Sequence, residues 1–399
     1  PWASKSETNS ALHLLSLNHG GVASGQVALN WKASGQATGH TVRLEVTTDA
    51  GSNWVRITEG VSASLGGVVW NSGSESSALA LWRVQDEVDP GVVATSERNF
   101  VLHNGPIYYY VNDEFTNSDV YCSAAGNSSN TGIRADSPKR WVAEILETYN
   151  LEPGDVVYVD NGRYQTAEAT TIGDLDAGSI SQDSGQQVSI VGNSNLVGGT
   201  AFIISDPEAS GFRLDGAYGI RLKNLSIQNA SNGVDIADGY YIAADQLNLR
   251  SCFNGAAIEA SSNIVFSHST LAGNQNAGIW FSASRLGSMN VDSSVFWSNR
   301  YGIYTHQGFT YVSNSILGML ASNNFGFCFR QDAPYWGIES DYNNLYVQQA
   351  GAAVGGFQIG FGGTASTSIY PTVSSWALAT GQDHHSLAHN PQFADPGNG

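Results

Sequence analysis

Cysteine, lysine and arginine are all scarce in this chain of 399 residues. Its three cysteines, Cys122, Cys252 and Cys328, are far apart and form neither a CxxC pair nor a zinc-ligand spacing. This excludes a disulfide framework and a zinc-finger type of metal site. Only 17 basic residues accompany 35 acidic ones, which gives a net charge of −18. Because nucleic acids and anionic membranes bind clustered cations, this balance argues against both as partners.

Long apolar runs are also missing, so we expect no membrane-spanning helix. Charged residues make up only 13% of the chain, whereas glycines number 45 and aromatic residues reach 11%. This combination is typical of a turn-rich, all-β extracellular protein, and we expect a secreted or cell-surface location. The sequence begins at Pro1 and not at a methionine, so we also expect a processed or excised segment of a longer protein.

The first hundred residues alternate between apolar and polar side chains in seven short runs. Turn signals such as Asp89-Pro-Gly91 separate the runs. This pattern predicts an antiparallel β-sandwich over residues 1–104. The segment 41–54 (TVRLEVTTDAGSNW) resembles the strand–hairpin–strand of immunoglobulin-like or fibronectin-III-like modules in bacterial surface proteins. That resemblance implies a spacer domain.

The next segment contains a predicted amphipathic helix at residues 139–150, which follows a start signal at Asp136-Ser-Pro138. Its apolar face has helical spacing and comprises Trp141, Val142, Ile145, Leu146 and Tyr149. With the strand predicted at 156–159, the stretch 120–164 resembles the entry segment of right-handed parallel β-helix proteins, including several polysaccharide lyases. The resemblance implies that the helix closes the N-terminal end of a stack of coils.

A glycine-centred motif then repeats in steps of 22, 23, 24 and 24 residues, at Gly233, Gly255, Gly278, Gly302 and Gly326. Each interval contains two further short apolar runs, so each coil should supply three strands. This arithmetic predicts an all-β fold whose second domain, residues 105–399, is a three-sided parallel β-helix, and the resemblance implies that the β-helix is right-handed. We expect regular coils over about 187–357 and an irregular segment at 358–399.

An internal ladder is predicted at one corner of the coils. Three or four residues before the successive glycines stand Asn229, Cys252, Asn274, Asn299 and Asn323. Asparagine amides can hydrogen-bond from coil to coil, and we expect Cys252 to be a buried substitute and not a reactive thiol.

Strand alternation places the second and fourth residues after each glycine on the outer surface. Side chains capable of binding or catalysis gather there: Asp235, Glu259, Trp280, Tyr304, His306 and Arg330. Cys328 is expected on the same surface. Trp280 and Tyr304, with Tyr335 and Trp336, could bind a glycan or a partner chain. Alternatively, rows of aromatic and charged side chains could stabilise the outer sheet or dock loops or a neighbouring chain.

The same face also permits catalysis. Asp235 and Glu259, about 8 Å apart by strand geometry, could act as an inverting glycosidase pair. Alternatively, His306 or Tyr304 could abstract a proton from a uronate while Arg330 neutralises its carboxylate, which is lyase chemistry.

Catalytic signatures of β-helix enzymes are missing from the sequence. The only lysine in the coils, Lys223, has no acidic cluster near it in sequence, although Asp235 could approach it from the next strand. We therefore predict an extracellular structural or adhesive surface or filament module, self-associating or glycan-binding through the outer face. A polysaccharide lyase, or less readily a glycoside hydrolase, is the alternative. No cofactor is required, Ca²⁺ stays open, and the histidines at 384, 385 and 389 are not expected to bind metal.

Overall fold

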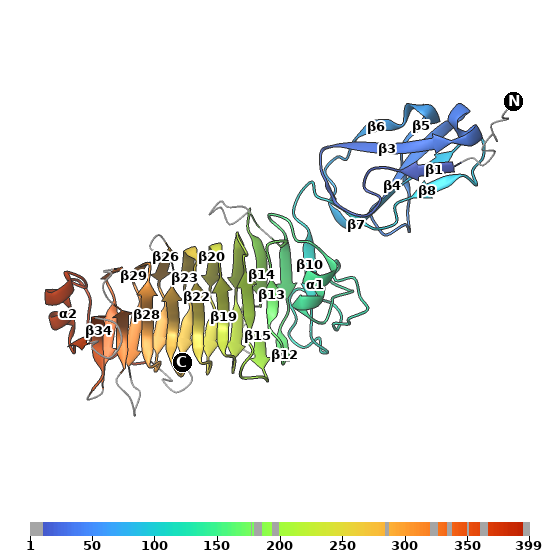
Figure 1. The fold of residues 1–399 in the computed structure, drawn as a ribbon. Coiled ribbons are helices and arrows are strands. Elements are labelled where there is room, and N and C mark those ends of the chain that lie inside the picture. Colours follow the sequence, from blue (N-terminus) through green and yellow to red (C-terminus); the bar gives the residue numbers. More distant parts are fainter. Residues whose placement is uncertain are drawn as a thin grey trace. The chain divides into compact units, whose positions relative to one another are not determined.

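A computed structural model describes residues 11–176, 178, 186–193, 199–283, 287–319, 326–332, 337–348, 351–359 and 366–393. The chain forms two compact units, Pro1–Ile107 and Tyr108–Gly399 (Figure 1). Among the described residues, no helix is long and apolar enough to cross a membrane.

The first unit is the predicted β-sandwich. One sheet has the order β1-β3-β6 and the other β2-β9-β7-β4-β5, with β8 paired to β7. Its elements are β1 (Ala11–Leu14), β2 (Val22–Ala23), β3 (Gln26–Ser34), η1 (Gly35–Gly39), β4 (Thr41–Thr47), β5 (Val55–Ser62), η2 (Ala63–Leu65), β6 (Gly67–Asn71), β7 (Ser77–Asp86), β8 (Val93–Thr95) and β9 (Phe100–Leu102). Trp31 and Trp82 are buried between the sheets, and their indole N–H groups donate to the carbonyls of Ala63 and Ser16. The core therefore buries both rings without an unpaired donor.

The second unit is a parallel β-helix with three faces. Sheet 1 contains β10 (Tyr108–Val111), β11 (Val156–Val159), β14 (Val188–Gly192), β17 (Ile220–Lys223), β20 (Tyr240–Asp245), β23 (Ser262–Ser267), β26 (Ser288–Asp292), β29 (Phe309–Ser313) and β32 (Ile338–Asp341). Sheet 2 contains β12 (Gly162–Thr166), β15 (Thr200–Ile204), β18 (Leu225–Gln228), β21 (Asn248–Arg250), β24 (Thr270–Ala272), β27 (Val295–Trp297), β30 (Ile316–Met319) and β33 (Asn344–Val347). Sheet 3 contains β13 (Thr170–Ile172), β16 (Phe212–Asp215), β19 (Asn232–Ala237), β22 (Asn254–Glu259), β25 (Ala277–Ser282), β28 (Tyr301–Gln307), β31 (Phe327–Asp332), β34 (Ala353–Ile359) and β35 (Ser366–Tyr370).

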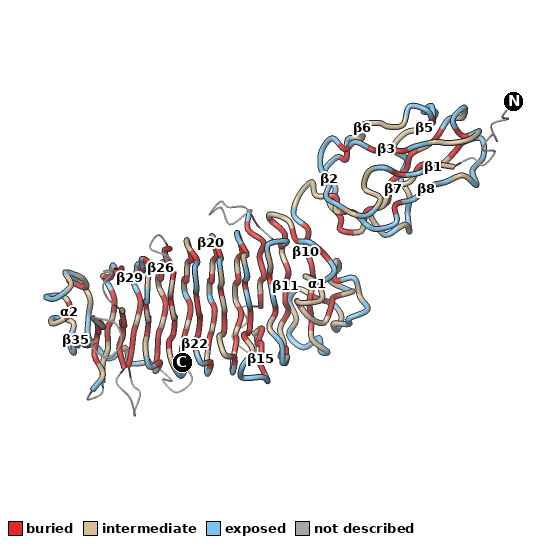
Figure 2. Tube along the Cα trace, viewed as in Figure 1, coloured by how far each residue is buried: buried red, intermediate tan, exposed pale blue. Residues whose placement is uncertain are grey.

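Inward side chains stack from coil to coil because the strands pair in register. In sheet 3 one inward row is fully buried and consists of Val234, Ala256, Ile279, Ile303 and Phe329. Figure 2 shows the alternation of buried and more exposed positions along the coils. Each large aliphatic or aromatic residue buried in this way contributes about 1.5–3 kcal/mol, so the repeated pattern is the main source of stability.

A polar ladder also runs inside one corner. Asn274 Oδ1 accepts from the backbone N–H of Cys252 (3.0 Å), and Asn299 Oδ1 accepts from the amide of Asn274 (3.0 Å). Asn229 does not join this ladder: it is exposed in the left-handed region (φ 66°), and Ala230 occupies the position equivalent to Cys252. Asn323 lies outside the described residues.

The N-terminal end of the stack is closed by α1 (Val142–Thr148), which confirms the predicted cap in a shorter form. Its residues Val142 and Ile145 are buried. Glu144 caps the N-terminus of α1, because its Oε2 accepts hydrogen bonds from the backbone N–H groups of Arg140 and Trp141. These hydrogen bonds satisfy donors that no helical carbonyl can reach.

The C-terminal end is closed by β35 and by α2 (Val373–Thr380), which the sequence pattern did not predict. Strand β35 pairs antiparallel with β34. The fully buried Trp376 of α2 stacks on Phe329 and Phe357, with ring centroids 5.6 and 5.2 Å apart. Its Nε1 donates to Asp383 Oδ2 (2.9 Å). Trp376 thus covers the last apolar layer of the β-helix. Because a single residue does this, no repeating pattern in the sequence indicates it.

Candidate functional site

The outward row of sheet 3 brings together residues from five neighbouring coils. In register along this row lie Asp235, Ala257, Trp280, Tyr304 and Arg330. Counting from the glycines had aligned Arg330 with His306 and had placed Cys328 outward. The structure instead pairs Ile303 with Phe329, so Cys328 stands opposite Gly302 and is fully buried.

Asp332, which the sequence pattern did not single out, is the centre of this face. Its Oδ2 accepts a hydrogen bond from the Tyr304 hydroxyl (2.8 Å) and lies 3.0 Å from His306 Nδ1. Arg330 Nη2 lies 3.7 Å from the other oxygen, Oδ1. The position of Asp332, two residues after Arg330 on one strand, was a usable signal, because alternate residues share a face.

Tyr304 is held protonated by these surroundings. Burial, followed by its hydrogen bond to the Asp332 carboxylate, raises the pKa of Tyr304 to about 12. Loss of the phenolic proton would place a second negative charge beside Asp332. Tyr304 therefore acts as a donor on this face at neutral pH.

His306 owes its position to an irregularity in the strand pairing. The register between β25 and β28 shifts, so that Ser282 pairs with Gln307 and His306 is the additional residue. Its side chain is 44% exposed beside Asp332. A residue inserted at such a bulge is re-aimed relative to the regular rows.

Asp235 and Glu259 are not brought into direct contact. Asp235 is half-buried and accepts a hydrogen bond from Ser210 Oγ (3.2 Å), whereas Glu259 is exposed and pairs with Ala237 and Ser282. One strand and two residues separate them, as the sequence count implied. Their role as a glycosidase pair stays a prediction.

The aromatic residues of this face form a continuous patch. Trp280 and Tyr304 are half-buried and directly opposite each other on adjacent strands. Tyr301 extends the patch, with its ring centroid 5.2 Å from that of Tyr304. We call the set Trp280, Tyr301, Tyr304, His306, Arg330 and Asp332 the Trp280 face. Tyr335 and Trp336, the other predicted contacts, lie outside the described residues.

Thiol and metal chemistry find no support in the described residues. All three cysteines are free and buried, and burial raises the pKa of the Cys252 thiol to about 11 and those of Cys122 and Cys328 further. No group of three His, Cys, Asp or Glu side chains in this part of the chain is placed to hold a metal ion. His385 is engaged with Asp341 (2.7 Å) and stacks on Tyr342.

A second charged cluster, on sheet 1, was missed by the sequence reasoning. Lys223 pairs in register with Asp245, and not with Asp235 as considered from the sequence. The Asp245 carboxylate lies 2.7 Å from Arg221 Nη2, 3.6 Å from Lys223 Nζ and 3.3 Å from His268 Nδ1. Lys223 and Asp245 are 22 residues apart, one coil period, so the repeat length itself could have indicated the pair.

Three in-register parallel sheets with internal ladders define the second unit as a right-handed parallel β-helix, and the chain as a β-helix repeat protein with an N-terminal β-sandwich. Residues 187–352, which include most of the regular coils, match the family model described as "Periplasmic copper-binding protein (NosD)". The coils are therefore similar to NosD. No curated protein and no solved structure matches the chain.

Proposed function

We propose that this protein is an extracellular or periplasmic surface module that binds a glycan through the Trp280 face. The observation that carries the proposal is the pair Trp280 and Tyr304, half-buried aromatic residues in register on adjacent strands. Adjacent strands are about 4.8 Å apart, so the two side chains offer one surface about as wide as a sugar ring. A broad apolar platform with a few fixed polar groups is the usual composition of a ligand site.

The polar groups of the Trp280 face are already oriented. Asp332 holds Tyr304 by a hydrogen bond and lies beside His306 and Arg330. Asp332 Oδ1 is buried and accepts no hydrogen bond from the described residues. Arg330 Nη2 faces this oxygen at 3.7 Å, so the carboxylate is held between Tyr304 and Arg330.

Catalysis is the weaker alternative on the same face. A general base works best with a pKa near the operating pH. Tyr304, whose pKa is about 12 and whose hydroxyl donates a hydrogen bond to Asp332, does not meet that condition. A lyase would therefore depend on His306 as the base and Arg330 as the carboxylate partner, and a hydrolase on Asp235 and Glu259.

Self-association remains a further proposal for this module. An open end of a β-helix exposes unpaired strand donors and acceptors and invites stacking. Here α1 covers one end, and β35 with Trp376 covers the other. Assembly with neighbouring chains would then use a lateral face. If that face is the Trp280 face, a neighbouring chain and a glycan would compete for the same surface.

Location outside the cytoplasm is supported by the periplasmic character in the description of the matching family. Copper binding, which the same description contains, does not fit the described residues. The three thiols that would attract Cu(I) are buried and separate, and no group of three candidate ligands is present in this part of the chain. We therefore propose no copper site.

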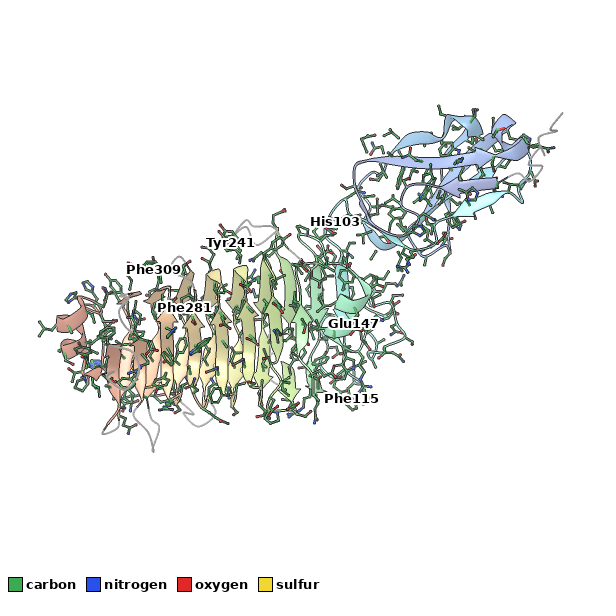
Figure 3. All side chains as sticks on the ribbon, viewed as in Figure 1. His103, Phe115, Glu147, Tyr241, Phe281 and Phe309 are labelled. Carbon is green, nitrogen blue, oxygen red and sulfur yellow. The ribbon has the colours of Figure 1, made fainter. Side chains whose placement is uncertain are left out.

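A glycan array followed by calorimetry tests the proposed function. The wild-type chain should retain a subset of glycans, and Trp280→Ala should weaken their binding at least tenfold. Phe115→Ala is the matched control, because Phe115 is an exposed aromatic of the same unit, 61% accessible and outside the Trp280 face (Figure 3). Equal affinity of the wild type and Trp280→Ala for every bound glycan would refute the proposal. New absorbance from unsaturated uronates would instead support the lyase.

A further inference from the structure

A surface hollow of about 390 Å³ lies on sheet 1, on a different face from Trp280. Its lining comes from four consecutive coils and comprises Gln187, Arg221, Tyr241, Ile242, Ala243, Asp245, Asn263, Val265, Ser267 and His268. We call it the Asp245 groove. Figure 3 labels Tyr241 at the level of β20, on the edge of the β-helix that also carries Phe309.

The groove has a small apolar floor between two polar walls. Ala243 and Val265, in register on β20 and β23, form the floor. One wall carries Asp245 with Ser267 and His268, which follow in the neighbouring coil. The other wall carries the ring of Tyr241 and the amide of Asn263. A floor of aliphatic carbon with hydrogen-bonding edges suits a ring that presents C–H groups on its face and hydroxyl groups at its rim, as a sugar does.

Tyr241 occupies a backbone conformation that is unfavourable for a bulky side chain. Its φ is 55°, and Asn263, at the equivalent place in the next coil, has φ 56°. Asparagine tolerates this left-handed region, whereas an aromatic residue there is an outlier. Gln187 Nε2 donates to the Tyr241 carbonyl (3.3 Å) and helps to hold the strained residue. The ring of Tyr241 lines the hollow and packs against the ring of Tyr240, with 4.3 Å between the two centroids.

The charge of the groove runs against that of the chain. Only 17 residues of 399 are Lys or Arg, yet Arg221 and Lys223 lie two residues apart on one face of β17. Arg221 and Asp245 line the groove and offset each other, and Lys223, which stands beside the lining, gives this group of three a net charge of +1. The guanidinium has five N–H donors in a planar fork, more than the one hydrogen bond to Asp245 uses.

The next carboxylate in the same row among the described residues is Asp292 on β26, which interacts with His268 of the groove and accepts hydrogen bonds from Ser293, Ser313 and Asn314. Three strand spacings separate Asp292 from Arg221 and Lys223, about 14 Å at 4.8 Å per strand. The net charge of the whole chain is screened beyond about 8 Å at physiological ionic strength, so repulsion from distant acids does not prevent binding of a small anion.

From these observations we infer that the Asp245 groove binds a saccharide unit that bears an anionic group, a carboxylate or a sulfate. Tyr241 stacks against the sugar ring, and Arg221, assisted by Lys223, pairs with the anionic group. Asn263, Ser267 and His268 contact ring hydroxyls. This site is separate from the Trp280 face and does not depend on it.

The test is calorimetric titration with three tetrasaccharides: an oligogalacturonate, a sulfated oligosaccharide and a neutral cello-oligosaccharide. At least one acidic probe should bind the wild type ten times or more tightly than the neutral probe, and whichever acidic probe binds better identifies the anionic group. Arg221→Gln should lower that affinity at least fivefold. Arg213→Gln is the matched control, because Arg213 pairs with Asp215 on the surface of sheet 3.

Tyr241→Asn separates binding from folding. Asparagine relieves the backbone strain while it removes the ring, so the melting temperature should stay equal or rise while affinity for the acidic probe falls at least fivefold. Trp280→Ala should leave this binding unchanged, which distinguishes failure here from failure of the proposed function. No binding of either acidic probe at millimolar concentration, equal binding of the neutral probe, or equal effects of Arg221→Gln and Arg213→Gln would overturn the inference.

Discussion

The Tyr304 hydroxyl donates a hydrogen bond to Asp332 Oδ2 over 2.8 Å and so joins two neighbouring coils at the centre of the Trp280 face. The same carboxylate oxygen lies 3.0 Å from His306 Nδ1. Because one carboxylate positions both side chains, it should control both the ionisation of Tyr304 and the order of the face.

Replacement of Asp332 by asparagine tests this control. Asp332→Asn removes the negative charge and the charged acceptor, so the pKa of Tyr304 should fall from about 12 towards its ordinary value of about 10, with burial still opposing ionisation. Ultraviolet difference titration should show one tyrosine ionising at lower pH than in the wild type. In Tyr304→Phe that component should be missing. Identical titrations of the wild type and Asp332→Asn would contradict the assignment.

The C-terminal closure is tested at Gly355. A Cβ at this position would collide with the ring of Trp376, which the surrounding Phe329 and Phe357 hold in place. Gly355→Ala should therefore lower the free energy of unfolding by about 1–3 kcal/mol, as overpacking does. Gly173→Ala is the control, because nothing lies within 4 Å of its added Cβ. Equal stability of the two variants in denaturant titrations would show that Trp376 does not seal the core.

The polar ladder is tested at Asn274. Its amide accepts from the N–H of Cys252 and donates to the carbonyl of Leu249, both buried. Asn274→Ala leaves these groups unpaired, so the free energy of unfolding should fall by about 2–4 kcal/mol. Asn229→Gly, which removes an exposed amide without straining the backbone, should change it by less than about 0.5 kcal/mol. If both variants unfold at the same denaturant concentration, the ladder contributes nothing.

Asp176 should give the β-helix an unusual dependence on pH. It is 7% exposed, and burial raises the pKa of its carboxyl from 3.8 to about 6. Between about pH 4 and pH 6 the unfolded chain ionises at this site while the folded chain does not, so stability falls as the pH rises. The full cost above pH 6 is about 3 kcal/mol.

Asp176→Asn removes this titration while its side-chain oxygen can still accept the N–H of Leu151. The stability difference between the variant and the wild type should therefore be small near pH 4 and should grow to a plateau above about pH 6. Unfolding curves measured across this range give the difference directly. A difference that is constant with pH would show that Asp176 ionises alike in the folded and unfolded chains.

The architecture could be predicted from the sequence because the length of one coil is fixed by geometry and appears as a regular repeat. Each coil must return to the same place above the last, so glycines such as Gly255 and Gly278 repeat at nearly constant steps. The predicted alignment was wrong at the last of these coils. Cys328, and not Gly326, stands opposite Gly302, so Arg330 pairs with a position two residues earlier than the glycine count predicts. A side chain had replaced the glycine that marked the register.

Site contacts were less accessible to sequence reasoning. Trp280 and Tyr304 could be placed on one face from strand alternation alone. Their polar centre, Asp332, could not be identified, because its role depends on a register shift that brings His306 alongside it. The pairing of Lys223 with Asp245 likewise required the alignment of two coils. Long-range contacts of this kind depend on geometry that no local pattern records.

The most direct test of the glycan-binding account is the indole N–H resonance of Trp280 in an NMR titration, assigned by its loss in Trp280→Phe. With the best array ligand, this resonance should shift in a saturable way, with the same affinity that calorimetry gives. The indole of Trp376, buried at the C-terminal cap, should stay in place. A Trp280 resonance that does not move while the ligand binds would contradict the account.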